Sequence, residues 1–70
     1  MQREHVESSN IESIGYEAKS QTLEIEFLNG TIYQYFDVPE PIYSELMKPG
    51  VSKGEYLARN IKGSYRYSRV

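Results

Sequence analysis

The sequence predicts a small α+β domain in which a three-stranded antiparallel meander packs on two short helices. Three observations favour this fold class. Apolar and polar residues alternate in three successive segments before Pro39. The turn sequence Leu28-Asn29-Gly30 joins two of these segments, and two later segments begin with helix-start signals. The 70 residues suffice for one domain and include no cysteine, so an apolar core must stabilise it without disulfides, and a reducing, cytoplasmic setting is expected.

The first ten residues are polar and show no periodicity. We therefore expect a flexible N-terminal arm at residues 1–10 and a single domain at residues 11–70. The polar start does not resemble a signal peptide, and no apolar run is long enough to cross a bilayer. We expect no membrane partner, and a monomer or a weak homodimer.

The register of the hairpin follows from its turn. A two-residue Asn29-Gly30 turn would place Ile25 opposite Gln34 and bury a glutamine. A three-residue loop with Gly30 in the left-handed conformation buries apolar residues instead. We therefore predict three pairs, Phe27 with Thr31, Ile25 with Tyr33, and Leu23 with Tyr35. The opposite face is then expected to be solvated, and it carries Glu24, Glu26, Ile32 and Gln34.

Two helices are expected after the sheet. Pro39 and Pro41 suit a helix start, and an apolar stripe runs from Ile42 to Met47 before Pro49-Gly50 ends the helix after Lys48. The second helix begins with the capping box Ser52-Lys53-Gly54-Glu55, flanked by the apolar pair Val51 and Tyr56. Leu57 and Ile61 are expected to face the core, and Gly63 to end this helix. Residues 64–70 alternate again, which is compatible with an edge strand.

Enzymatic chemistry has little support in the sequence. His5 is the only histidine and lies in the expected arm, where a general base or a metal ligand would not be held in position. No glycine-rich phosphate loop follows a strand. We expect no enzyme, and therefore no catalytic residue, no cofactor and no metal.

The charge of the chain is strongly asymmetric. Residues 1–47 contain nine carboxylates against Arg3 and Lys19, whereas residues 48–70 contain six cations against Glu55 alone. Cations interleaved with tyrosines are typical of nucleic-acid surfaces, because cations bind phosphates and aromatic rings stack on bases. The candidate RNA-binding residues are Lys53, Arg59, Lys62, Tyr65, Arg66, Tyr67 and Arg69.

Other interpretations of these cations remain open. Arg59 follows Glu55 by four residues, which suits an exposed ion pair on a helix. Lys62, Arg66 and Arg69 are equally compatible with pairing to the acidic half of the chain. The net charge of −2 argues against strong non-specific binding to nucleic acid.

Several ordered motifs together resemble one known family. They are Val6-Glu7-Ser8-Ser9-Asn10-Ile11, Ile14-Gly15-Tyr16, Leu23-Glu24-Ile25-Glu26-Phe27, Asn29-Gly30, Tyr33-Gln34-Tyr35, Val38-Pro39, Ser52-Lys53-Gly54 and Ile61-Lys62-Gly63. From about residue 6 onward the chain is similar to the KTSC domain family, named after a C-terminal extension of some lysyl-tRNA synthetases and also free-standing in bacteria and phages.

The resemblance implies motif positions but no established function. This chain departs from the family pattern at two places. Pro49-Gly50-Val51 stands where a small residue is usual before the serine, and Leu57-Ala58 stands where Phe-Asn is frequent. The association with a tRNA synthetase suggests a tRNA-like RNA partner. The alternative is a protein-interaction module that uses an edge strand or exposed apolar residues such as Ile32. The implied motif positions are Tyr33, Tyr35, Val38, Pro39, Ser52 and Gly54.

Overall fold

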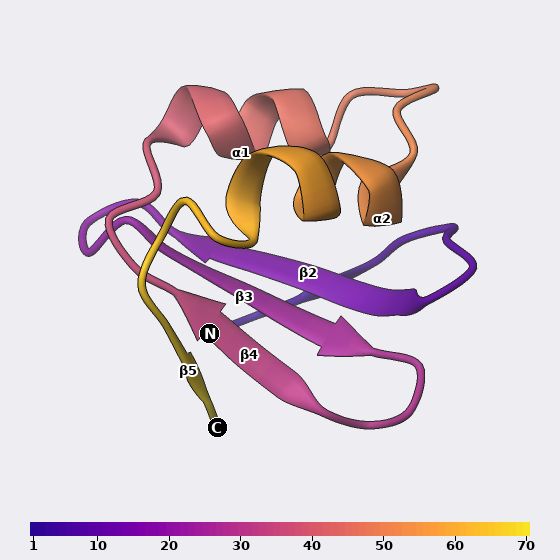
Figure 1. The fold of residues 1–70 in the computed structure, drawn as a ribbon, viewed down its shortest axis with the longest axis horizontal. Helices are drawn as coiled ribbons and strands as arrows, with labels where there is room; N and C mark the ends of the chain where they lie inside the picture. The colour runs from indigo at the N-terminus through magenta and orange to yellow at the C-terminus, as the bar shows by residue number, and fades with distance from the viewer.

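The computed structural model describes residues 1–70 as one five-stranded antiparallel sheet with helices on one face (Figure 1). The strand order is β1-β2-β3-β4-β5, so each strand pairs with its neighbours in the sequence. The helices lie nearest β2, while β4 and β5 form the side of the sheet farthest from them (Figure 1). The strands are β1 (Glu4–His5), β2 (Ile11–Glu17), β3 (Thr22–Phe27), β4 (Ile32–Tyr35) and β5 (Tyr67–Arg69).

The small α+β class is confirmed, but the sheet has five strands and not three. The possible C-terminal edge strand is present as β5, and the N-terminal residues add β1, which was not expected. Residues 1–10 were expected to form a flexible arm. Instead, Glu4 and His5 pair with Ile14 and Ser13, and Val6 is buried in the core. A strand this short pairs through its backbone and shows no side-chain alternation, so periodicity does not reveal it.

At the other end, β5 pairs with β4 and places Tyr67 opposite Tyr35 and Arg69 opposite Tyr33. Tyr67 and Arg69 therefore lie on the same face of the sheet as the two β4 tyrosines.

The β3–β4 hairpin has the predicted register. Ile25 lies opposite Tyr33 and Leu23 opposite Tyr35. Gly30 has a φ of +91° and donates its N–H to the carbonyl of Phe27 at 2.9 Å. The amide of Phe27 donates to the carbonyl of Thr31, also at 2.9 Å, so the loop contains three residues as expected.

The helical segments are shorter than the sequence suggested. Helix α1 covers Glu40–Leu46 and ends before the predicted Lys48. Helix α2 covers Lys53–Tyr56 and continues as the π-helical turn η1, Leu57–Ile61. The Ser52 hydroxyl accepts the amide of Glu55 at 3.4 Å, but the Glu55 carboxylate pairs with Arg59 and does not fold back on Ser52. Only half of the predicted capping box is therefore formed.

The core lies between the helices and the face of the sheet that carries Ile14, Ile25 and Tyr35, called here the inner face. Leu46, Leu57 and Ile61 close it from the helix side, so the two inward positions predicted on the second helix are confirmed. None of the helices is long and apolar enough to cross a membrane.

The outer face of the sheet, opposite the helices, is not the solvated surface that was expected. Glu24 is only 7% exposed there. Arg3 contacts Glu24 and donates to Ser13 Oγ at 3.0 Å, and Gln34 Nε2 donates to Glu24 Oε1 at 2.8 Å. Gly15 makes this possible, because a Cβ at that position would lie 2.5 Å from the carbonyl oxygen of Gln2. The N-terminal segment therefore packs directly over β2.

Candidate nucleic-acid interface

Two tyrosines stack at the edge of the inner face where β4 meets β5. The rings of Tyr33 and Tyr67 are parallel within 1° and their centroids are 5.7 Å apart. The ring of Tyr35 lies 6.0 Å from that of Tyr67 and is buried, whereas Tyr67 is 61% exposed. The strand period of two brings these rings together, because each is at an inner-face position of its strand. The result is an aromatic surface that begins in the core and ends in solvent.

A small hollow of about 300 Å³ adjoins this stack, lined by Tyr33, Tyr35, Lys62, Gly63 and Tyr67. Gly63 has a φ of +83°, a conformation that suits glycine and turns the chain from η1 toward β5. Burial, and secondarily the neighbouring Tyr33 and Tyr67, raise the pKa of the Tyr35 phenol. That group therefore stays neutral at physiological pH.

Two cations near the tyrosine stack have no ion-pair partner, Lys62 in the lining of the hollow and Arg69 on β5. Lys62 Nζ lies 5.7 Å from the centroid of the Phe27 ring and forms no salt bridge. Arg69 is exposed, forms no salt bridge, and stands opposite Tyr33 across the β4–β5 pair. We call Tyr33, Lys62, Tyr67 and Arg69 the tyrosine surface. It combines exposed ring area with two uncompensated positive charges.

The other predicted cations do not join this surface. Lys53 Nζ donates to the carbonyls of Lys48 at 2.8 Å and Val51 at 3.3 Å, so it stabilises the loop between the helices. Arg59 Nη2 lies 3.6 Å from a Glu55 carboxylate oxygen on the same helical segment. Lys53 keeps its charge but is held against this loop, and Arg59 is paired on its own helical segment, so neither adds a free cation to the tyrosine surface. The basic segment is therefore less uniform than the sequence suggested.

Arg66 occupies an intermediate position beside the tyrosine surface. Its guanidinium pairs with Asp37 at 2.8 Å and lies 5.7 Å from the Phe36 ring centroid. A second hollow of about 670 Å³ surrounds it and shares Gly63 and Tyr67 with the first. Tyr65 lines this hollow and packs partly against the core, so it is less accessible than Tyr67. Phe36 was not among the predicted residues, and only the position of Arg66 reveals it.

Most of the family motif positions have structural roles. Tyr35 and Val38 are in the core, Pro39 precedes α1, and Ser52 caps α2. Gly54 leaves room for the Asn10 side chain, since a Cβ there would lie 2.4 Å from Asn10 Oδ1. Among the motif positions, Tyr33 is the one that belongs to the tyrosine surface.

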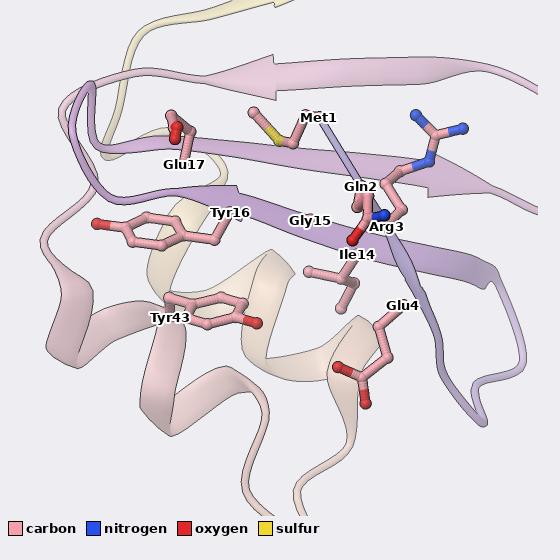
Figure 2. Close-up of a pocket in the computed structure, with 9 residues that line it drawn as sticks. All are labelled: Met1, Gln2, Arg3, Glu4, Ile14, Gly15, Tyr16, Glu17 and Tyr43. Atoms are coloured by element: carbon pink, nitrogen blue, oxygen red, sulfur yellow. The ribbon is translucent and has the colours of Figure 1, made fainter.

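A further hollow of about 450 Å³ lies beneath the N-terminal segment (Figure 2). Tyr16 and Tyr43 stack on its helix side with centroids 4.7 Å apart, and the Tyr16 hydroxyl donates to the Val38 carbonyl at 2.6 Å. Figure 2 shows the Arg3 side chain pointing away from these rings. His5 pairs with Glu12 at 3.2 Å, and no group of three or more potential ligand residues is arranged to hold a metal. These groups stabilise the fold and converge on no common point.

The chain belongs to the KTSC domain family, because the family model of the KTSC domain matches residues 7–65. It is 41% identical over 64 residues to a lysine–tRNA ligase of Nostoc punctiforme, covering 91% of this chain but 11% of that enzyme. The chain therefore spans about a tenth of the length of the lysine–tRNA ligases that it matches. It is also 35% identical to an uncharacterized protein of Stutzerimonas stutzeri, covering 100% of this chain and 99% of the relative.

The fold matches that of a solved relative. A KTSC domain protein from Yersinia pestis, known from its crystal structure, is 41% identical in sequence to this chain, and the two structures superpose with a TM-score of 0.90. The superposition covers 99% of this chain and 96% of the Yersinia pestis chain. The same small domain is thus found as a nearly whole protein and as a minor segment of a much larger enzyme.

Proposed function

We propose that this chain is a non-catalytic binding domain that holds RNA on its tyrosine surface. One observation carries the proposal: the exposed ring of Tyr67 stacks on Tyr33, and two cations without an anionic partner accompany them, Lys62 in the same hollow and Arg69 opposite Tyr33. Stacking on aromatic rings combined with phosphate contacts from lysine and arginine is the usual means by which proteins bind unstructured nucleic acid.

The charges set the expected strength of binding. Only Lys62 and Arg69 are free on this surface, and the net charge of the chain is −2. Few counterions are then released, so we expect modest affinity with a slope of log affinity against log salt of roughly −1 to −2. Binding of this kind depends on stacking as much as on charge.

The relatives support the choice of RNA. Several of them are lysine–tRNA ligases that carry a segment similar to this chain. A domain attached to an enzyme that acts on tRNA is in a position to add an RNA contact, so a tRNA-like RNA in a cytoplasmic setting is the partner that we propose. Attachment is an association, and the tyrosine surface supplies the physical reason for binding.

Titration of labelled tRNA at about 50 and 200 mM salt tests the proposal. The variant carries Lys62→Gln and Arg69→Gln, and the charge-matched control carries Lys19→Gln and Arg59→Gln, which lie off the surface. We expect the variant to lose most of its affinity and its salt dependence, and the control to bind as the wild type does. Equal binding by the two double variants, or binding that ignores salt, would contradict the proposal.

The free edge of β5 favours a second candidate, a protein-interaction module. The amide of Phe36 bonds to the carbonyl of Arg66, and that of Val70 to the carbonyl of Ile32. Because edge-strand groups alternate in direction, the backbone groups of Tyr67 and Arg69 face away from β4 and are available to an added strand. An Arg69→Pro variant removes one of these donors, while Arg69→Gln removes only the charge.

A pull-down after nuclease treatment tests this second candidate. The Arg69→Gln variant should capture a protein partner, and the Arg69→Pro variant should not. The absence of any captured protein, or equal capture by both variants, counts against it.

A further inference from the structure

We infer that the tyrosine surface takes an unpaired nucleotide, with its base against Tyr67 and its phosphate near Lys62 and Arg69, and that it does not take a double helix. This inference rests on the proposed function and specifies the class of RNA. It follows from the size and lining of the hollow, the exposed face of one ring, the position of the cations, and the second hollow beside the first.

The first hollow suits one flat ring. Its volume is about 300 Å³, and three of its five lining residues are tyrosines. Tyr33 covers one face of the Tyr67 ring in a parallel stack, yet Tyr67 remains 61% exposed. The free face of Tyr67 is therefore available to a base. A base within a double helix has both faces covered by its neighbours, whereas an unpaired base has a face to offer.

The charges are placed for the backbone of the same nucleotide. Lys62 lines the hollow, and Arg69 stands opposite Tyr33 on the neighbouring strand. No carboxylate lines this hollow, so a phosphate approaching it meets no negative charge there. A base and its own phosphate can thus be held by one ring and two cations.

A second nucleotide has a place beside the first. The larger hollow, about 670 Å³, shares Gly63 and Tyr67 with the smaller one and adds Phe36 and Arg66. Gly63 has no side chain, and a Cβ built on it would meet nothing within 4 Å. Gly63 therefore contributes only backbone where the two hollows adjoin. Arg66 forms an exposed ion pair with Asp37, and a phosphate can compete with the Asp37 carboxylate for the guanidinium group.

The chemistry of the surface also predicts little preference for sequence. Ring faces stack on every base, and the cations contact only phosphates, so neither reads the hydrogen-bonding edge of a base. Strands of uridine and of adenosine should bind within a few-fold of each other.

Fluorescence polarisation with a labelled single-stranded RNA of about eight nucleotides, alone or annealed to its complement, tests the inference. The variants are Tyr67→Ala and the ring-preserving control Tyr67→Phe, with thermal melting as a check on folding. We expect the single strand to bind at least about ten-fold more tightly than the duplex. Tyr67→Ala should weaken it about five- to a hundred-fold, and Tyr67→Phe should leave it nearly unchanged.

The outcomes separate this inference from the proposed function. Equal binding of single strand and duplex, unaffected by Tyr67→Ala but lost with Lys62→Gln and Arg69→Gln, would overturn the inference and leave RNA binding on this surface intact. If neither the single strand nor the duplex binds, both the inference and the proposed function are overturned.

Discussion

The guanidinium group of Arg3 pairs with the carboxylate of Glu24, which is only 7% exposed on the outer face of the sheet. This contact joins the N-terminal segment to β3, across β2, and it explains why residues expected to be an arm contribute to the sheet. Glu24 is also held by the amide of Gln34, so the carboxylate has partners on two sides.

Loss of the Arg3 side chain should destabilise the fold. Replacing Arg3 by alanine leaves a buried carboxylate with one partner fewer, and we expect the free energy of unfolding to fall by about 1–3 kcal/mol. Lys19→Ala is the matched control, because Lys19 is exposed in the β2–β3 turn and should change stability by less than about 0.5 kcal/mol. Urea denaturation measures both, and equal effects would show that the pair contributes nothing.

Acid should weaken the fold through Glu24. Burial alone would raise the pKa of its carboxyl group, but hydrogen bonds from Gln34 and Arg3, together with the Arg3 charge, lower it below the ordinary value of 4.5. A group whose pKa is lowered by folding stabilises the protein above its unfolded pKa. That contribution is lost as the pH falls from about 4.5 through the lower pKa of the folded state.

Unfolding free energies measured across this acid range for the wild type and Glu24→Gln check the effect. The variant should be less stable at neutral pH and should lose less stability on acidification. If the free energies of unfolding of the two proteins fall in parallel with decreasing pH, other carboxylates cause the acid dependence.

Gly15→Ala should displace the N-terminal segment. The added Cβ would lie 2.5 Å from the backbone oxygen of Gln2, which cannot rotate away as a side chain can. We expect a loss of about 1–3 kcal/mol. Because the segment also carries Arg3, the effects of Gly15→Ala and Arg3→Ala should be markedly less than additive. Full additivity of the two losses would mean that Arg3 stays in place when the segment moves.

The contact between Asn10 and Gly54 should appear as a coupling energy. A Cβ on Gly54 would lie 2.4 Å from Asn10 Oδ1, so Gly54→Ala forces that side chain to move. In the Asn10→Ala background the clash is absent, and alanine should stabilise α2 by up to about 1 kcal/mol through its helix propensity. A double-mutant cycle should therefore give a coupling of about 1 kcal/mol or more. An effect of Gly54→Ala that is the same in both backgrounds would contradict the contact.

The β3–β4 hairpin shows how much local sequence can predict. Alternation with period two and the requirement for a glycine in a left-handed turn together select one register, and Ile25 lies opposite Tyr33 as expected. The helix starts at Pro39 and Ser52 were predictable for the same reason, since caps depend on residues adjacent in the chain.

The candidate site was only partly predictable. Lys62, Tyr67 and Arg69 were among the candidates because of charge and composition, but Tyr33 was predicted only as a residue of the buried hairpin face and as a family motif position. Lys53, Arg59 and Arg66 were grouped with them, although their neighbours in the structure engage them. Which cation meets which anion depends on segments that are distant in sequence, as with Arg66 and Asp37.

The amino-acid order by itself determined the small α+β class, the hairpin register and the helix starts, because each depends on side-chain period or on turn chemistry within a few residues. Only the tertiary structure decided that the N-terminal residues enter the sheet and that Lys62 and Arg69 stay unpaired near Tyr67. The physical reason is that strand pairing uses backbone groups common to all residues, and that charge compensation is set by distances in space.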